Sequence, residues 1–180
     1  MQIDLGRLTR PLSALAVCAT LVGCATPAGP KAMVSDSAQV IHQHPYSVAV
    51  RTAGGRDTDA MGASQISDAS LQAAIADSIT ATRVFSEVVQ GKDGDYVLSV
   101  SVVEMEQPVF GFDLTVHMEA GWSLKDVKSG QVVWQNSIRS NHTSTVNDAF
   151  AAVARLRLAT EGAAKENIRR GIEQLSRLSL

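Results

Sequence analysis

The sequence predicts an α+β domain of two layers, in which two helices cover one face of a mainly antiparallel sheet. Polar and apolar residues alternate strictly along residues 112–125, which is typical of a strand with one buried face. Apolar residues instead recur at three- or four-residue steps along residues 66–88 and 147–178, as in amphipathic helices. The predicted order of elements is strand-helix-strand-strand-helix.

The first strand is expected at residues 45–50, where valines occur in a β-rich run, PYSVAV. The helix that follows can be capped by Ser67 or Asp68, whose side chains accept hydrogen bonds from free backbone N–H groups. We expect it to end near Thr82. Its apolar stripe consists of Leu71, Ile75 and Ile79.

The middle of the chain predicts paired strands. In DYVLSVSVVEME (95–106), one face carries Tyr96, Leu98, Val100 and Val102. The buried face of the next strand is predicted to consist of Phe112, Leu114, Val116, Met118, Ala120, Trp122 and Leu124. A turn at DVKSGQ, where Gly130 can adopt a positive φ, leads to the antiparallel strand VVWQNSIRS.

The last segment, residues 147–178, is expected to form one long helix or two abutting helices. Asn147 or Asp148 can cap its N-terminus. The core-facing stripe is predicted to contain Phe150, Val153, Ala164, Ile168, Ile172, Leu175 and Leu178.

The N-terminal residues resemble an export signal. Arg7 and Arg10 frame the start of an apolar stretch, residues 11–23, that is shorter than the roughly twenty residues needed to span a bilayer. The sequence Leu21-Val22-Gly23-Cys24 then resembles the bacterial lipobox, in which the cysteine thiol is diacylated and the chain is cut just before it.

This resemblance divides the chain into a lipoprotein signal peptide (1–23), a flexible tether (24–39) and a single periplasmic domain (40–180). In Gram-negative lipoproteins an aspartate after the cysteine commonly retains the product in the inner membrane, whereas Ala25 stands here. The resemblance therefore implies a lipid anchor at Cys24 in the outer membrane, with the domain on the periplasmic face. The alternative is an ordinary secretory signal with a chance cysteine.

Composition argues against several functions. The formal net charge is −2 and no cluster of lysine and arginine stands out, so no nucleic-acid partner is expected. Histidines at positions 42 and 44 lack a third metal ligand nearby, and Glu104 and Glu106 are interpreted as exposed strand residues. Without a catalytic motif, we expect no enzyme activity, no catalytic residue, no metal and no cofactor.

Two connections are candidate contact surfaces. The loop TAGGRDTDAMGASQ (52–65) is long for a compact domain, but it lacks the Gly-Lys-Ser/Thr ending of a phosphate-binding loop. The connection EMEQPVFGFD (104–113) carries Pro108, Val109, Phe110 and Phe112. These four residues either cover the edge of the core or form an exposed apolar patch for a partner or a lipid chain.

The segments TATRVFSEV, DYVLSVSVV and SGQVVW, followed by the long C-terminal helix, resemble the auxiliary lipoproteins of ABC-type transport systems. Peptidoglycan-synthase activator lipoproteins and the curli-secretion lipoprotein have a related architecture. The resemblance implies a non-catalytic outer-membrane lipoprotein that is an accessory subunit in envelope transport or assembly and binds an envelope protein. The alternatives are an activator of a cell-wall synthase, or a protein that binds a lipid or small molecule between helices and sheet.

Overall fold

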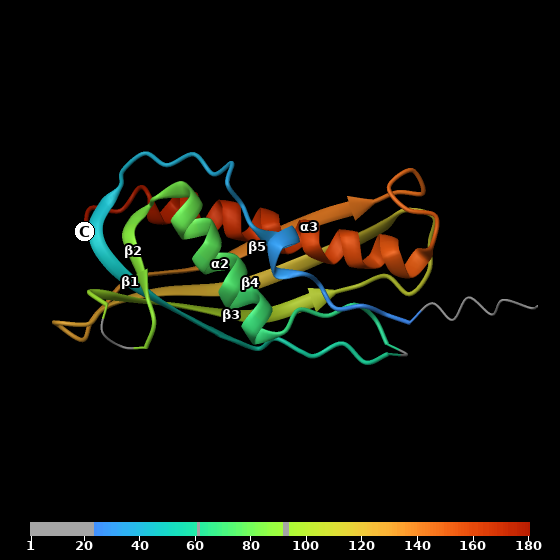
Figure 1. The fold of residues 1–180 in the computed structure, drawn as a ribbon, viewed down its shortest axis with the longest axis horizontal. Helices are drawn as coiled ribbons and strands as arrows, with labels where there is room; N and C mark the ends of the chain where they lie inside the picture. The colour runs from blue at the N-terminus through green and yellow to red at the C-terminus, as the bar shows by residue number, and fades with distance from the viewer. Residues whose placement is uncertain (1–23, 61, 92–93) are drawn as a thin grey trace, which may run out of the picture.

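The computed structural model describes residues 24–60, 62–91 and 94–180, which form a five-stranded sheet and three helices (Figure 1). The strands are β1 (His44–Ala53), β2 (Phe85–Val89), β3 (Tyr96–Glu106), β4 (Leu114–Asp126) and β5 (Val132–Ser144). The helices are α1 (Pro30–Met33), α2 (Asp68–Thr82) and α3 (Ala152–Leu175). The α+β class predicted from the sequence is confirmed.

The sheet is mixed, with the strand order β2-β1-β3-β4-β5. β1 runs parallel to both β2 and β3, whereas β3, β4 and β5 are joined by antiparallel pairing. The parallel pairing of β1 with β2 follows from the crossover through α2. Parallel neighbours need a connection that carries the chain back to the end of the sheet where the first strand begins. The predicted order named too few strands, since it omitted β2 and counted the antiparallel strands incompletely.

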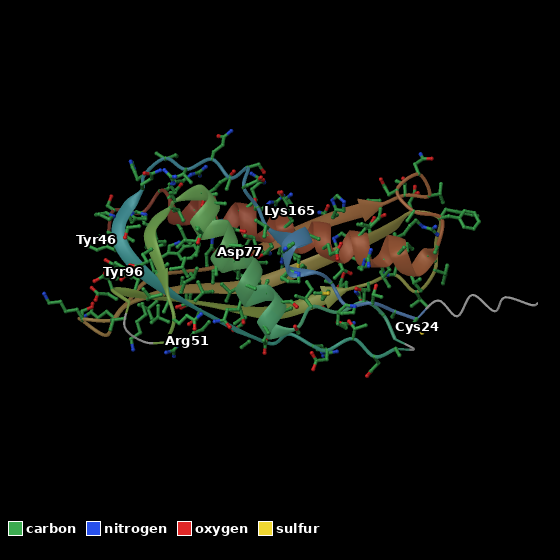
Figure 2. The ribbon with its side chains drawn as sticks, viewed as in Figure 1. Cys24, Tyr46, Arg51, Asp77, Tyr96 and Lys165 are labelled. Carbon is green, nitrogen blue, oxygen red and sulfur yellow. The ribbon has the colours of Figure 1, made fainter. Side chains whose placement is uncertain are left out.

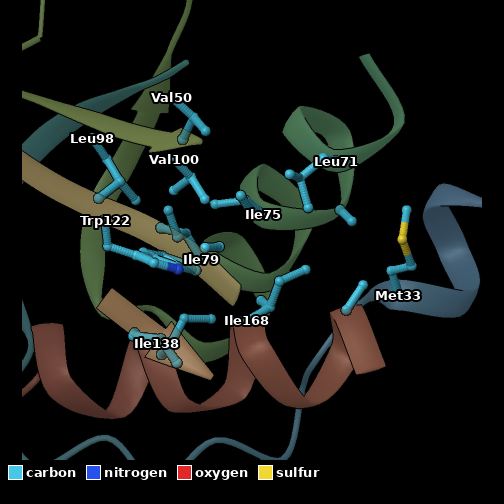
Figure 3. Close-up of a cluster of buried hydrophobic side chains, with 14 of the residues drawn as sticks. Met33, Val50, Leu71, Ile75, Ile79, Leu98, Val100, Trp122, Ile138 and Ile168 are labelled. Atoms are coloured by element: carbon cyan, nitrogen blue, oxygen red, sulfur yellow. The ribbon is translucent and has the colours of Figure 1, made fainter. Parts of the chain in front are cut away.

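The core lies between the sheet and the helices α2 and α3, which pack on the same face (Figure 3). The even-numbered residues of β4 from Leu114 to Leu124 are all buried there, as the alternation predicted. Trp122 is fully buried, and its indole Nε1 donates a hydrogen bond of 2.9 Å to Asn167 Oδ1 on α3. A Cβ on Gly171 would lie 2.5 Å from Trp122 Cη2, so glycine is needed for this close approach of helix and sheet.

The segment predicted as a flexible tether packs against the domain. Ala28 and Met33 are fully buried in the core cluster, and α1 lies against both α2 and α3. Ser35 N donates a hydrogen bond of 2.9 Å to Ser78 Oγ. The low complexity of the sequence hid this docking, because small residues can fit closely against a helix without showing any periodicity.

The long C-terminal helix begins later than predicted, with Ala151 at its N-cap position and no side-chain cap. The Asp148 carboxylate accepts hydrogen bonds from the backbone N–H and the hydroxyl of Thr145, which fixes a turn before the helix. Phe150 therefore lies outside the helix and is 99% exposed, and Val153 in the first turn is 42% exposed. The predicted place of both residues in the core-facing stripe is wrong. In the part of the chain that the structure describes, no helix has the length and apolar character to cross a bilayer.

Candidate functional site

An exposed apolar surface, here called the apolar tip, lies at one end of the sheet. Two connections form it, namely residues 107–113 between β3 and β4 and residues 145–151 between β5 and α3. They leave the same end of the sheet because the first residue of β4 pairs with the last residue of β5. The apolar tip consists of Val109, Phe110, Phe112, Val146 and Phe150.

The side chains of the apolar tip point away from the domain. Phe110 is 88% exposed, Phe112 is 83% exposed and Val109 is 95% exposed, whereas Pro108 is half-buried. Of the two alternatives given for the connection between β3 and β4, the exposed apolar patch therefore matches the structure. Phe112 was expected to begin the buried stripe of β4, but the strand starts at Leu114 and the residue is free in the connection.

Arg155 holds the two connections of the apolar tip together. Its side chain is buried in the first turn of α3, and Nη1 donates hydrogen bonds to the carbonyl oxygens of Ala149 at 3.0 Å and Phe150 at 2.6 Å. Nη2 donates to the carbonyl oxygen of Gly111 at 3.5 Å. Among the described residues no carboxylate forms an ion pair with Arg155, so the guanidinium serves these backbone carbonyls alone.

Cys24 is exposed and lies at the same end of the molecule as the apolar tip (Figure 2). The residues after it are fixed to the domain from their first backbone N–H, because Ala25 N donates to Ala60 O at 3.1 Å and Ala28 N to Gln65 O at 3.1 Å. The lipobox residues Leu21, Val22 and Gly23 lie outside the described residues.

Helix α3 holds the other side of this N-terminal segment. Arg157 Nη1 donates to Thr26 Oγ1 at 3.1 Å, and Glu161 Oε1 accepts a hydrogen bond of 2.9 Å from Gly29 N. Because Arg157 is two residues from Arg155, the segment beginning at Cys24 and the apolar tip are attached to the same two turns of α3.

The loop of residues 52–65, interpreted from the sequence as a contact surface, contacts this segment. Ser64 Oγ donates to Thr26 O at 2.9 Å. Gln107 Nε2 connects the loop to the base of the apolar tip, since it donates to Ser64 O at 2.6 Å and to Thr160 Oγ1 at 2.9 Å. The loop, the N-terminal segment and α3 thus form one hydrogen-bonded unit at this end.

The opposite face of the sheet, here called the uncovered face, has no helix on it (Figure 1). A β-bulge between Val102 and Glu104 places Glu104 and Glu106 on this face beside Glu119 and His117. Glu119 Oε2 accepts a hydrogen bond of 2.8 Å from Arg139 Nε. Hydrogen bonds from Ser137 and then from Arg139 lower the pKa of Glu119, so this carboxylate stays charged.

The histidine pair considered from the sequence does not converge. His42 is exposed, whereas the imidazole of His44 is buried and hydrogen bonds through Nε2 to the carbonyl oxygen of Leu175 at 3.0 Å. Within the described ranges no group of three histidine, cysteine, aspartate or glutamate side chains is arranged to hold a metal ion.

Sequence reasoning missed Val146 and Phe150 as members of the apolar tip. Their spacing fits a helical stripe, and only the position of the helix start distinguishes a core residue from a loop residue. The available sequence signal was the spacing of Thr145 and Asp148, because their side chains can hydrogen bond to nearby backbone and close a local turn, as the structure shows.

Comparison with protein-family models and with curated protein sequences finds no match. Among solved structures, protein XCC0632 of Xanthomonas campestris, from the family DUF330, has a TM-score of 0.59 and 14% identity, over 78% of this chain and 89% of its own. The hypothetical protein CT253 of Chlamydia trachomatis has a TM-score of 0.52 and 8% identity, over 73% of this chain and 98% of its own.

A third similar structure, lipoprotein GNA1162 of Neisseria meningitidis, has a TM-score of 0.44 and 15% identity, over 74% of this chain and all of its own. At these identities the first two likenesses show the fold alone. The described chain therefore shares its α+β fold with proteins of Gram-negative bacteria.

Proposed function

We propose that this protein is a lipid-anchored, non-catalytic lipoprotein of the Gram-negative envelope that serves as an accessory subunit in envelope transport or assembly. Its anchor is a lipid on Cys24, in the outer membrane, and its partner is an envelope protein. The observation that carries the proposal is the position of Cys24, which is exposed at one end of the domain and is followed directly by a docked segment.

The uncovered face and the free edge of β5 support binding to a protein partner. β5 is a 13-residue edge strand that pairs with β4 alone among the described strands. Side chains of α3 already donate to the carbonyl oxygens of Ile138 and Arg139, so the outer backbone groups on either side of these two residues are the ones proposed for strand addition. Valines at positions 103 and 132, which are 65% and 55% exposed, add apolar area to the uncovered face. A partner strand added at β5 would extend the sheet and cover part of this area.

The docked N-terminal segment argues against an activator that reaches across the periplasm to the cell wall. Such reach needs a free tether, whereas the segment from Ala25 to Ser35 is hydrogen bonded to the domain. A ligand site between helices and sheet is equally disfavoured, because that space is filled by fully buried side chains such as Trp122 and Ile168.

The anchor is tested by labelling cells with radioactive palmitate while they express the full chain or its Cys24→Ser variant. We expect label in the full chain and in the membrane fraction, and none in the variant. An unlabelled, exported protein with an intact bond between residues 23 and 24 would contradict the lipid anchor.

The partner surface is tested with a photo-crosslinking amino acid at Gln135, an exposed residue of β5. The matched control is the same amino acid at Asp77, an exposed residue of α2 on the helical layer (Figure 2). We expect Gln135 alone to capture a component of an envelope transport or assembly system. Capture of the same proteins from both positions would contradict a partner at the β5 edge.

A further inference from the structure

We propose that the apolar tip inserts into the interface of the bilayer that holds the lipid of Cys24, so that the domain stands on the membrane by this end. The inference rests on the proposed lipid anchor and goes beyond it, because a lipid alone fixes only the first residue. It assigns the tip to lipid and leaves the uncovered face for protein.

The first step of the argument is the length of chain between lipid and domain. Ala25 N is already hydrogen bonded to Ala60 O at 3.1 Å, so the first fixed point is the residue directly after the lipid-bearing Cys24. A residue spans at most about 3.6 Å. An acyl chain in the bilayer therefore holds this end of the domain in contact with the headgroups.

The second step is what this end presents. The chain contains four phenylalanines, and three of them, Phe110, Phe112 and Phe150, lie in the apolar tip with more than four-fifths of their surface exposed. The fourth, Phe85, is buried in the core. Exposed apolar clusters are typical of interaction sites, and the surface nearest to this cluster is the bilayer.

The third step is rigidity. The pairing of Leu114 with Ser144 holds the bases of the two connections side by side. Arg155 adds a hydrogen bond of 2.6 Å to the Phe150 carbonyl oxygen and a longer contact of 3.5 Å to the Gly111 carbonyl oxygen. Insertion then costs little additional ordering, because the aromatic side chains are carried on backbone that the domain already fixes.

The charges near the tip indicate the kind of membrane contact. Asp113 and Asp148 are exposed in the same two connections, and the cationic group between them, Arg155, is buried. Hydrogen bonds from the backbone and side chain of Thr145 lower the pKa of Asp148 and keep it charged.

Attraction to anionic lipid would need exposed cations. The two connections contain no lysine or arginine, and the partly exposed Arg157 nearby is paired with Glu161 at 3.7 Å. We therefore expect apolar insertion that responds weakly to salt and to lipid charge.

Insertion is tested in the lipidated protein, reconstituted into phosphatidylethanolamine–phosphatidylglycerol vesicles. An environment-sensitive fluorophore is attached to Phe110→Cys, to Phe150→Cys or to the control Asp77→Cys. Each variant then has one free thiol, because Cys24 is acylated and Cys18 is removed with residues 1–23. We expect a blue shift and quenching by nitroxide-labelled lipids at positions 110 and 150, and neither effect at position 77. Water-like emission at 110 and 150 in a protein that carries palmitate would overturn the inference.

A second measurement separates the tip from the lipid. The unlipidated Cys24→Ser protein, produced from residue 24 onward so that the apolar signal segment is absent, is floated with vesicles of phosphatidylcholine alone or with added phosphatidylglycerol, at low and high salt. We expect measurable binding in all four conditions, and a loss of about a hundredfold in Phe110→Ser/Phe150→Ser, about tenfold for each phenylalanine. The matched control Val103→Ser/Val132→Ser, which removes exposed valines from the uncovered face, should bind as the parent does.

The two results distinguish the proposals. Absence of palmitate from Cys24 would contradict the proposed anchor, while flotation would still report on the tip. No flotation by the unlipidated protein, or equal flotation by the tip variant and its parent, would overturn membrane insertion. Self-association in solution that the tip substitutions abolish would assign the tip to a second copy of the chain instead.

Discussion

Aromatic side chains serve opposite purposes in two regions of this molecule. Trp122 of β4 is buried beneath α3, where Asn167 accepts a hydrogen bond from its indole N–H. Phe150, which precedes the first turn of the same helix, is almost completely exposed. The core region gains its stability from burial within the chain, whereas the apolar tip can gain from burial only when something outside the domain covers it.

The largest effect is expected from truncating the buried aromatic side chain, Trp122. We expect Trp122→Ala to lower the free energy of unfolding by about 4 kcal/mol, because it leaves a cavity beneath α3. Urea denaturation followed by circular dichroism measures the loss. The conservative Trp122→Phe should retain part of the stability, and an unchanged midpoint for Trp122→Ala would contradict the packing described.

The polar centre of the core gives the next largest effect. Asn167→Ala should cost about 2 kcal/mol, since the buried Trp122 N–H and the Ile138 carbonyl oxygen both lose their partner. Its control is Asn136→Ala, which removes an exposed hydrogen bond to Gln174. We expect the control to unfold within about 0.5 kcal/mol of the parent.

Substitutions on the outer surface of α3 are expected to have a smaller effect on stability than those in the core. Glu166 contacts Arg169 and Arg170 at 2.7 Å each, and the hydrogen bond from Arg169 is the main cause that lowers its pKa from the usual 4.5 to about 2. A lowered pKa means that the contribution to stability is present above pH 4.5 and is lost as the pH falls towards 2.

Because these side chains are partly exposed, we expect this contribution to be about 1 kcal/mol. Thermal unfolding measured between pH 6 and pH 2 checks this. We expect the unfolding temperature to fall more steeply with decreasing pH in the parent than in Glu166→Gln. Parallel losses in the two proteins would contradict a role for this ion pair.

The smallest effect on stability is expected at the apolar tip. Phe110→Ser/Phe150→Ser should unfold within about 0.5 kcal/mol of the parent, because exposed side chains lose no internal contacts. The same thermal scans at neutral pH measure this. A large destabilisation would show that the two phenylalanines belong to the folded core in solution, which would remove the contrast between the regions.

The sequence predicted best where one face of an element is buried along its whole length. The alternation in β4 placed six residues from Leu114 to Leu124 correctly, since a one-residue slip would reverse all of them. The stripe of α2 and its end near Thr82 were equally clear, and Ser67 caps this helix by accepting a hydrogen bond from Ser70 N.

The sequence predicted poorly where long-range contacts decide. β2 is only five residues long and is defined by its parallel pairing with β1, so its own sequence carries little signal. The docking of residues 24–35 depends on partners as distant as Glu161. At the apolar tip the residue types were recognised in one connection, but the second connection and Arg155 were not, because only the fold brings them together.

The docked N-terminal segment also has a mechanical consequence. Met33 belongs to the buried core, and the backbone from Ala25 onward is hydrogen bonded along the loop that ends β1. A force applied to an anchored Cys24 would act first on these hydrogen bonds, one after another. It would then reach the core through α1, because no unattached chain lies between Cys24 and the domain. Tension at the bilayer would thus reach the folded core directly, because the segment that carries the anchor is itself packed into the domain.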